Sequence, residues 1–317
     1  MAFLLLAGLA VAASYLKQER GPDPFAGESF YVDPDSKASR QADQWRSSRP
    51  RDAEQMDKIA SQPATYYFSE WTEDTGAGTA GQVDNRVSRI TSTGALPVLG
   101  AYAIPERDCG GYAGGGFGTA EQYRAWIQDF ARGIGDRKAV VVLEPDALSD
   151  FSCLSLAERV ERLALIREAV GVLKENPRTY VYIDAGHPGW HGAFAMAARL
   201  KVAGVGGADG FALNVSNFYD TPQNAAYGSK VSGFLGGEHF VVDTSRNGNG
   251  QAPDFDWCNP PGRALGPRPT ADTGDPLVDA YYWFKWPGES DGECGGNPPA
   301  GTWMPEYALG LSRRAAY

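Results

Sequence analysis

Three apolar runs in the chain each end at an acidic residue. Short runs rich in β-branched residues are typical of strands buried on both faces of a sheet. Carboxylates just past the carboxyl ends of parallel strands converge on one rim of a barrel, where acid–base catalysis, metal binding or sugar binding can take place. The three acids that follow these runs are Asp146, Asp184 and Asp243.

Each of these acids also has a purely structural interpretation. Asp146 would suit the N-cap of the segment after it, and Asp184 and Asp243 share that ambiguity. The functional interpretation is a carboxyl group whose pKa is raised by apolar neighbours, so that it can donate a proton. Aromatic residues near the presumed rim favour a sugar ligand, because flat sugar faces stack on aromatic rings. These residues are Tyr102, Trp190, Trp257, Trp283 and Trp286.

Motifs for metals and cofactors are weak. His187 and His191 are four residues apart, but a proline and a glycine between them disrupt the helical turn that a zinc pair needs. The segment 243–248 begins like a calcium loop, yet its twelfth position is Asp254 rather than Glu. The sequence has no phosphate-binding loop, dinucleotide fingerprint or nucleophile elbow. We therefore expect no metal and no cofactor.

The elements that must position these acids alternate along the chain. Alternating strands and helices predict an α/β fold, and about seven strands predict a single distorted, incompletely closed (β/α) barrel that is TIM-barrel-like. The clearest helix carries a capping box at its start, formed by Ser155 and Glu158. The expected strands are 65–69, 95–101, 139–143, 180–184, 210–214, 239–243 and 278–284. The expected helices are 81–93, 120–134, 155–174, 190–201 and 221–234.

Composition narrows the class of protein. The net charge of −10 argues against nucleic acid, which needs clustered Lys and Arg, and against an anionic membrane surface. A hydrophobic content of 43% can supply one large core, and no repeat or low-complexity linker divides the chain. We expect one catalytic domain at 53–317, preceded by a polar lead-in at 15–52.

Residues 2–13 form an apolar stretch that is too short to span a bilayer comfortably. It ends in small residues, as signal-peptide cleavage sites do, although no positive charge precedes it. We expect residues 1–14 to be an export signal or a short anchor, so that the protein is secreted or tethered.

Four cysteines stand outside any C-x-x-C pair, which argues against structural zinc. In an exported protein they predict two disulfides, with three possible pairings. Sequential pairing would close two loops and stabilise the fold by about 4 kcal/mol for each loop. Two long irregular loops, 105–119 and 246–279, each hold a cysteine, and we expect both on the rim with the acids. The cysteines are Cys109, Cys153, Cys258 and Cys294.

Taken together, the motifs resemble glycoside hydrolase family 6, the inverting cellulases, over roughly residues 30–316. Each motif is modest alone, but their joint order and spacing are specific. The resemblance implies β-1,4-glucan chains as substrate, and we expect a monomer with no obligatory protein partner. It agrees with sequential cysteine pairing. The motifs are RDCG at 107–110, LEPD at 143–146, YIDAGH at 182–187, NVSN at 214–217, DTSRNGNG at 243–250, WC at 257–258, GR at 262–263 and KWPGESDG at 285–292.

The resemblance implies roles for the acids. Asp146 matches the general acid, and Asp108 matches the aspartate that keeps Asp146 protonated and helps to steer the attacking water. Asp291 matches the proposed base, restrained by Arg246. Inversion requires an acid and a base roughly 6.5–9.5 Å apart on opposite faces of the sugar. We further expect that Arg107 keeps Asp108 ionised, and that this charge raises the pKa of Asp146.

Other positions match supporting parts of the family site. Asp184 matches a supportive acid of the cleft, and Tyr102 matches the tyrosine that crowds the sugar at the cleavage point. Tyr66 stands where a tryptophan platform is common in the family. The positions that match substrate-binding residues are Trp190, Trp257, His187, Asn214, Lys285 and Glu289, with Arg246 and Tyr66 beside them.

One departure concerns the serine that commonly holds the nucleophilic water in the family. Counting from Asp108, its position falls on Gly114. Cellobiohydrolases of this family carry longer loops that roof the cleft into a tunnel. Here the stretch from Asp272 to the final helix is short, which favours an open cleft and internal cleavage, hence an endo-β-1,4-glucanase. Two alternatives stay open: a glucan-binding protein on the same fold with little turnover, and a cellobiohydrolase or other β-glucan hydrolase.

Overall fold

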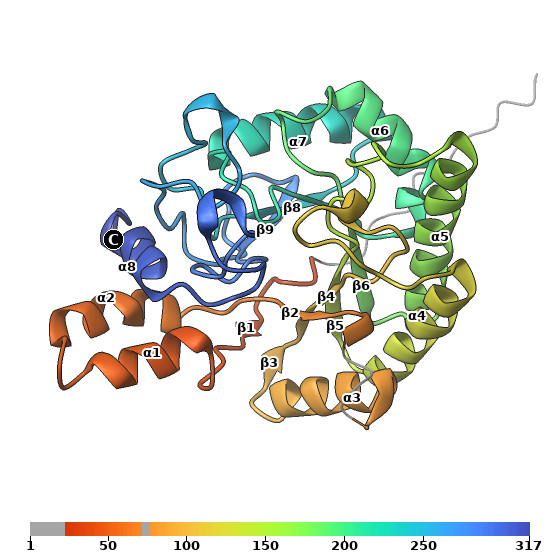
Figure 1. The fold of residues 1–317 in the computed structure, drawn as a ribbon. Coiled ribbons are helices and arrows are strands. Elements are labelled where there is room, and N and C mark those ends of the chain that lie inside the picture. Colours follow the sequence, from red (N-terminus) through yellow and green to blue (C-terminus); the bar gives the residue numbers. More distant parts are fainter. Residues whose placement is uncertain (1–22, 72–75) are drawn as a thin grey trace, which may run out of the picture.

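The computed structural model describes residues 23–71 and 76–317 (Figure 1). The expected export signal or anchor at 1–14 lies outside the described residues. Within the described ranges, no helix has both the length and the apolar character needed to cross a membrane. The segment expected as a polar lead-in holds helix α1 (Lys37–Trp45) and the start of α2 (Pro50–Ala60).

Seven parallel strands form one sheet in the order β2-β4-β5-β6-β7-β8-β9. Because β2 and β9 are its two edges, the barrel is incompletely closed, which confirms the predicted fold class. One backbone hydrogen bond joins the chain beside the two edges, from the N–H of Thr65 to the carbonyl of Trp283 at 3.0 Å. The strands are β2 (Tyr66–Phe68), β4 (Val98–Ala101), β5 (Ala139–Leu143), β6 (Thr179–Asp184), β7 (Gly210–Leu213), β8 (Phe240–Asp243) and β9 (Val278–Tyr282).

Helices cover the outer face of this sheet (Figure 1). The predicted capping box begins α5: the Ser155 hydroxyl accepts the N–H of Glu158, and the Glu158 carboxylate accepts the N–H of Ser155. A second group, α1, α2 and α8 (Pro305–Arg313), packs together at one side of the barrel. The outer helices are α3 (Gly78–Thr91), α4 (Ala120–Ile134), α5 (Leu156–Lys174), α6 (Ala193–Val202) and α7 (Thr221–Leu235).

Strand β5 shows why its sequence is an unbroken apolar run. All five of its residues are buried. Val141 packs with the outer helices, whereas Val140 and Val142 point into the barrel interior beside Phe25. Both faces of the strand are therefore covered, as is typical of parallel sheets.

Two predicted elements differ from the observed ones in instructive ways. The expected strand at 95–101 is divided at Pro97 into β3 (Ala95–Leu96) and β4, since proline lacks the N–H that a ladder needs. Strand β3 pairs with β1 (Ser29–Phe30) in a separate small sheet. The expected helix at 190–201 begins only at Ala193, because Gly192 holds extended backbone.

Candidate active site

A cleft of about 1440 Å³ lies at the carboxyl ends of the strands. Its lining includes residues that follow β2, β4, β5, β6, β7 and β9, so the rim gathers segments that are distant in sequence. Most of the predicted site residues lie on this surface. They are Tyr66, Tyr102, Asp108, Gly114, Asp146, His187, Trp190, Trp257, Lys285, Trp286, Glu289 and Asp291.

Three predicted site residues lie behind the cleft rather than on its surface: Asp184, Arg246 and Asn214. The Asn214 amide donates to the backbone carbonyl of Asp243 at 2.8 Å. Asn214 therefore organises the backbone instead of facing the cleft, and Asn217, from the same motif, lines the cleft in its place.

Asp146 occupies a strained turn directly after β5. Its backbone φ is +66°, a left-handed conformation that is uncommon outside glycine. Its N–H donates to Asp184 Oδ2 at 2.9 Å, and its side chain faces the cleft. Burial raises the pKa of Asp146 well above its usual range, and the nearby charges of Asp184 and Asp108 raise it further. The carboxyl group therefore retains a proton at a pH where an exposed aspartate has lost it.

Asp184 is the member of this pair that loses its proton first. At the end of β6, its carboxylate accepts the N–H groups of Asp146 at 2.9 Å and of Gly186 at 3.1 Å. Burial raises the pKa of Asp184 to about 7, while the two N–H donors oppose that shift. Because hydrogen bonds to the charged form favour ionisation, the proton of the pair resides on Asp146.

Asp108 lies on the loop after β4 and is partly exposed. Its carboxylate accepts the N–H of Ala113 at 2.9 Å, which fixes the side chain within its own loop. Burial raises the pKa of Asp108, the hydrogen bond from Ala113 lowers it, and the charge of Asp150 raises it again.

The predicted effect of Arg107 on Asp108 has the expected sign but is small. Its guanidinium binds Glu70, with Nη1 and Nη2 at 2.6 Å and 3.0 Å from the two carboxylate oxygens. Nη1 also donates to the carbonyl of Tyr102 at 2.7 Å. Arg107 therefore ties the loop after β4 to the end of β2, and it contributes least among the influences on the pKa of Asp108.

Asp291 reaches the cleft from the loop after β9. Its carboxylate lies 2.8 Å from Nη1 of the fully buried Arg246, as the predicted restraint requires, and it also accepts the N–H of Asn259 at 3.0 Å. The ammonium of Lys285 is 3.8 Å from its other oxygen. Two cations and a backbone donor thus hold this carboxylate in one orientation on the wall of the cleft.

Asp243, at the end of β8, resolves as a structural acid. Its buried carboxylate accepts the N–H groups of Ser216 at 3.0 Å, Ser245 at 2.8 Å and Lys285 at 3.1 Å. These donors belong to three different rim segments. Burial raises the pKa of Asp243 to about 6, against the effect of these hydrogen bonds.

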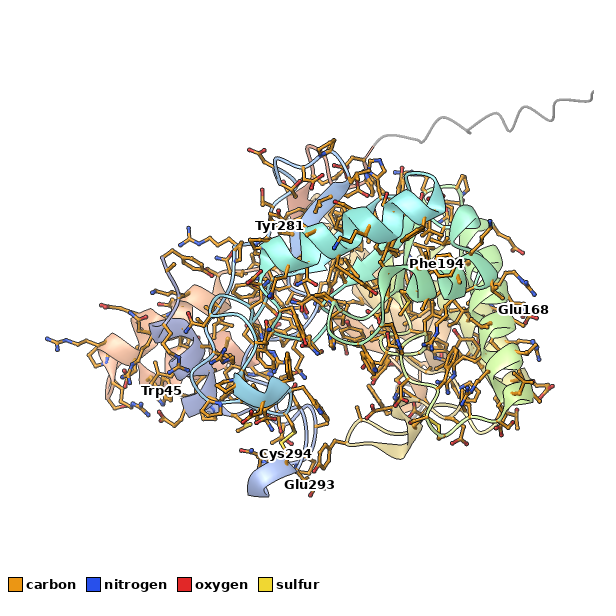
Figure 2. The ribbon with its side chains drawn as sticks, turned by 90° about the horizontal axis from the view of Figure 1, so that it is seen from above. Trp45, Glu168, Phe194, Tyr281, Glu293 and Cys294 are labelled. Atoms are coloured by element: carbon orange, nitrogen blue, oxygen red, sulfur yellow. A yellow bond between two sulfur atoms is a disulfide. The ribbon has the colours of Figure 1, made fainter. Side chains whose placement is uncertain are left out.

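Two disulfides pin the rim loops, and the sequential pairing is confirmed. Cys109 is bonded to Cys153, and Cys258 to Cys294. The first bond ties the loop of Asp108 to the chain between β5 and α5. The second ties the 246–279 loop to the loop of Asp291, and Figure 2 shows Glu293 and Cys294 where this loop projects from the body of the protein.

His187 belongs to an aromatic stack rather than to a pair with His191. Its ring lies 4.6 Å from the ring of Tyr219 and 5.3 Å from that of Trp190, between centroids. Burial lowers the pKa of His187 to about 4. Nε2 of His191 lies instead 2.7 Å from the carbonyl of Ser149.

Gly114 has no room for a side chain in this loop conformation. A Cβ placed on it would lie 2.9 Å from Gly110 Cα and 2.9 Å from the carbonyl oxygen of Gly111, both of them backbone atoms. A serine at 114 would require the loop to move.

Several lining residues were missed from the sequence, above all Trp71, Tyr112 and Phe255. Tyr112 packs against Gly292 of the opposite loop, where an added Cβ would lie 2.3 Å from the Tyr112 Cβ. The two walls of the cleft therefore touch at this point. Aromatic residues within the predicted rim loops were the available signal. Part of the lead-in also reaches the cleft, through Asp33, Asp35, Ser36, Lys37 and Arg40.

Comparisons with known proteins agree with this geometry. The family model of glycosyl hydrolases family 6 matches residues 25–315. Endoglucanase A of Cellulomonas fimi is 41% identical over 297 residues, 93% of this chain and 63% of that relative. Endoglucanase 1 of Streptomyces halstedii is 42% identical over 97% of this chain and 95% of that relative. The 1,4-β-D-glucan cellobiohydrolase C of Emericella nidulans is a more distant relative, at 31% identity over 69% of this chain and 62% of that relative.

A solved structure has the same fold with a ligand bound. It is the endoglucanase Cel6 from Mycobacterium tuberculosis, in complex with a methyl-cellobiosyl-thio-cellobioside. It is 46% identical to this chain, covers 93% of it and 100% of its own length, and superimposes with a TM-score of 0.88. The chain therefore belongs to the glycosyl hydrolases of family 6.

Proposed function

We propose that this protein is a secreted, endo-acting β-1,4-glucanase that cleaves internal glucosidic bonds with inversion of configuration. The endoglucanases that align over 93% and 97% of this chain support internal cleavage. The two disulfides support secretion, because such bonds persist in oxidising compartments. The enzyme acts as a monomer on β-1,4-glucan chains and requires no cofactor or protein partner.

The observation that carries this proposal is the set of three carboxyl groups in one cleft, Asp108, Asp146 and Asp291. Asp146 is the general acid: its raised pKa keeps the proton that the leaving glycosidic oxygen needs. Asp184, behind it, ionises first, and its negative charge then raises the pKa of Asp146 further.

Asp108 modulates the acid and steers water. Its carboxylate is tied to Ala113, so its position depends on the loop rather than on the substrate. Its charge is among those that raise the pKa of Asp146. Because Gly114 provides no hydroxyl, backbone groups of this loop and Asp108 hold the attacking water.

Asp291 is the candidate base on the opposite wall. Arg246 and Lys285 neutralise its charge in part, while the oxygen nearer Lys285 stays available to receive a proton. An inverting enzyme needs this carboxylate and the acid roughly 6.5–9.5 Å apart, so that water fits between the base and the sugar.

Aromatic rings bind the glucan, and polar residues orient it. Tyr102 crowds the sugar at the cleavage point and favours its distortion. Lys285 and Glu289 hydrogen-bond to hydroxyl groups beside it. The aromatic residues that provide stacking surfaces are Tyr66, His187, Trp190 and Trp257.

Hydrolysis of cellohexaose, followed by NMR, tests the proposal. The first-formed anomer at the new reducing end is α if the reaction inverts, and a β-anomer overturns the mechanism. A rapid fall in the viscosity of carboxymethylcellulose relative to reducing-sugar release indicates internal cleavage. A slow fall in viscosity, with cellobiose as the main product, contradicts it.

One observation favours a second candidate, a glucan-binding protein with little turnover. Gly114 leaves the site without the serine that commonly holds water in the family. Comparing the wild type with Asp146→Ala on carboxymethylcellulose separates the two functions. Equal, near-background release of reducing sugar from both proteins, with glucan binding retained, would establish the binding protein.

A further inference from the structure

The chain that joins Tyr102 to Asp108 is irregular, and its backbone must find hydrogen-bond partners outside a sheet. Ala103 and Ile104 are fully buried at its start. Buried N–H and carbonyl groups are costly when they are left unpaired. Within this loop, the carbonyl of Ala103 accepts the N–H of Phe117 at 3.0 Å, and that of Glu106 accepts the N–H of Cys109 at 3.2 Å. The other partners of this segment, 103–106, come from a neighbouring part of the barrel.

Glu144 satisfies the two N–H groups at the start of the segment. Its Oε2 accepts the N–H of Ala103 at 3.0 Å and that of Ile104 at 3.1 Å, and its Oε1 is 3.1 Å from the N–H of Ala103. Glu144 directly follows β5, two residues before Asp146, and only 1% of it is exposed. Its backbone is left-handed, with φ of +50°, like that of Asp146.

Arg162 satisfies the two carbonyl groups at the end of the same segment. Its Nη2 donates to the carbonyl of Pro105 at 2.6 Å and to that of Glu106 at 2.7 Å. Its Nη1 donates to the carbonyl of Asp150 at 3.3 Å. Arg162 lies on α5 and is 3% exposed.

We propose that Glu144 and Arg162 are positioning residues that clamp the 103–106 segment against residues 144–150, and thereby set the spacing between Asp108 and Asp146. The inference rests on the proposed function of these two aspartates. One clamp residue accepts from N–H groups and the other donates to carbonyl groups, so four consecutive residues are fixed in direction as well as in distance. Neither residue touches the cleft surface, so neither is catalytic.

The clamp keeps ionisable groups where apolar ones would pack more cheaply. Burying a carboxyl or guanidinium group costs free energy that hydrogen bonds only partly return. Burial raises the pKa of Glu144 to about 7 and lowers that of Arg162, which reflects this cost. Both are fixed between the loops that carry the acid and its modulator, where geometry matters most for proton transfer.

Two substitutions that each remove a clamp group, and one conservative substitution, test the clamp. Glu144→Met removes the acceptor of two N–H groups, and Arg162→Met removes the donor of three carbonyl contacts. Glu144→Gln keeps one oxygen where both N–H groups converge. The matched control is Lys174→Met on the same helix, whose ammonium donates to the carbonyl of Thr179 at 2.8 Å, at the amino end of β6.

We expect Glu144→Met and Arg162→Met to lower kcat on cellohexaose by about 10- to 100-fold, with KM changed by less than about threefold, because the loss concerns the geometry of proton transfer. The basic limb of the pH profile of kcat/KM should move to lower pH by about half a unit, since Asp108 then raises the pKa of Asp146 less. Glu144→Gln should recover most of the activity. Lys174→Met should leave kcat and the pH profile unchanged, whatever its melting temperature.

Circular dichroism establishes which variants fold. If Glu144→Met or Arg162→Met folds and shows an unchanged kcat and an unchanged basic limb of the pH profile, the clamp is overturned. Equal losses in Lys174→Met would also overturn it, because stability alone would then explain them. If both methionine variants fail to fold, Glu144→Gln and Arg162→Lys decide the question by the position of the basic limb of the pH profile. A larger downward shift in Arg162→Lys than in Glu144→Gln supports the clamp. No shift in either variant overturns it. An inactive wild type would instead refute the proposed function.

Discussion

The carboxyl groups on the rim fall into two sets that differ in what they contact. Glu144, Asp184 and Asp243 stand at the strand ends, are at most 1% exposed, and accept backbone N–H groups from neighbouring rim segments. Asp108 and Asp146 stand on the loops beyond the strands, and their side chains face the cleft. A strand-end acid therefore organises the rim, whereas the acids placed further along face the cleft, where we propose that they carry out the chemistry.

The difference follows from where backbone groups lose their partners. Parallel strands stop at the rim, and the N–H groups of the loops that follow them have no hydrogen-bond partner in a neighbouring strand. A carboxylate at the strand end accepts two or three of them at once. Asp291 combines both behaviours, because Asn259 and Arg246 restrain it while it still lines the cleft.

The largest expected effect comes from the acids that face the cleft. Asp146→Ala should lower kcat on carboxymethylcellulose by about 10³-fold or more, because protonation of the leaving group contributes about 10²–10⁴-fold. An aryl cellobioside with a good leaving group needs no such proton, so it should lose far less activity in the same variant. Equal losses on both substrates would remove Asp146 from the role of acid.

Substitution of a strand-end acid should affect the stability of the protein more than its kcat. Asp243→Asn replaces one acceptor oxygen by a donor, so at least one of the N–H groups of Ser216, Ser245 and Lys285 loses its partner. The free energy of unfolding, measured with urea, should fall by about 1–3 kcal/mol. In the folded fraction, kcat should fall by less than about tenfold. A loss of kcat as large as that of Asp146→Ala, without loss of stability, would contradict the distinction between strand-end acids and cleft-facing acids.

The buried strand-end acids should make the stability of the wild type depend on pH. Burial raises the pKa of Glu144 and of Asp184 to about 7 and that of Asp243 to about 6, whereas unfolded carboxyl groups titrate near pH 4, at about 3.9–4.3. The folded state binds protons more tightly in this window, so the free energy of unfolding should fall as the pH rises from about 4 to about 7. Melting temperatures between pH 4.5 and 7.5 check this trend.

At still lower pH the trend should reverse. Burial raises the pKa of Glu70, but hydrogen bonds from Arg107, Ser69 and backbone N–H groups together outweigh it and lower the pKa to about 2. The stabilisation from Glu70 is present above its unfolded pKa and is lost as the pH falls towards about 2. A melting temperature that rises steadily from pH 4.5 to 7.5 would show that the organising acids are ionised at little cost.

The smallest effect should come from Asp150, a cleft-lining acid that the sequence did not single out. Its charge raises the pKa of both Asp146 and Asp108. Asp150→Asn keeps the oxygen that accepts the N–H of Ser152 at 2.9 Å. The basic limb of kcat/KM should move to lower pH by a fraction of a unit, with the maximal rate within about twofold. An upward shift would contradict the electrostatic account.

Much of the fold could be predicted because local patterns are strong. The run at 139–143 is apolar at every position, and Ser155 with Glu158 marks the start of α5 without reference to the rest of the chain. The exceptions arose where one residue changes the backbone, as at Pro97. The N-terminal helix α1 was not predicted, since its polar surface resembles a solvated lead-in until α2 and α8 pack against it.

The sequence was less informative about which polar side chains face the cleft. Asn214 and Asn217 lie in one motif, and nothing in their spacing tells which of them faces outward. Arg107 adjoins Asp108, yet its guanidinium binds Glu70, which is distant in sequence. Contacts of this kind depend on the relative placement of strands and not on neighbours along the chain.

By itself, the sequence determined the alternation of strands and helices, the acids at the strand ends and the motifs that mark the family. These follow from hydrophobic periodicity and from short-range hydrogen bonding, which act over a few residues. Only the tertiary structure decided which acids face the cleft and which fasten the rim. That division depends on burial and on N–H groups from other strands, and both exist only once the barrel has formed.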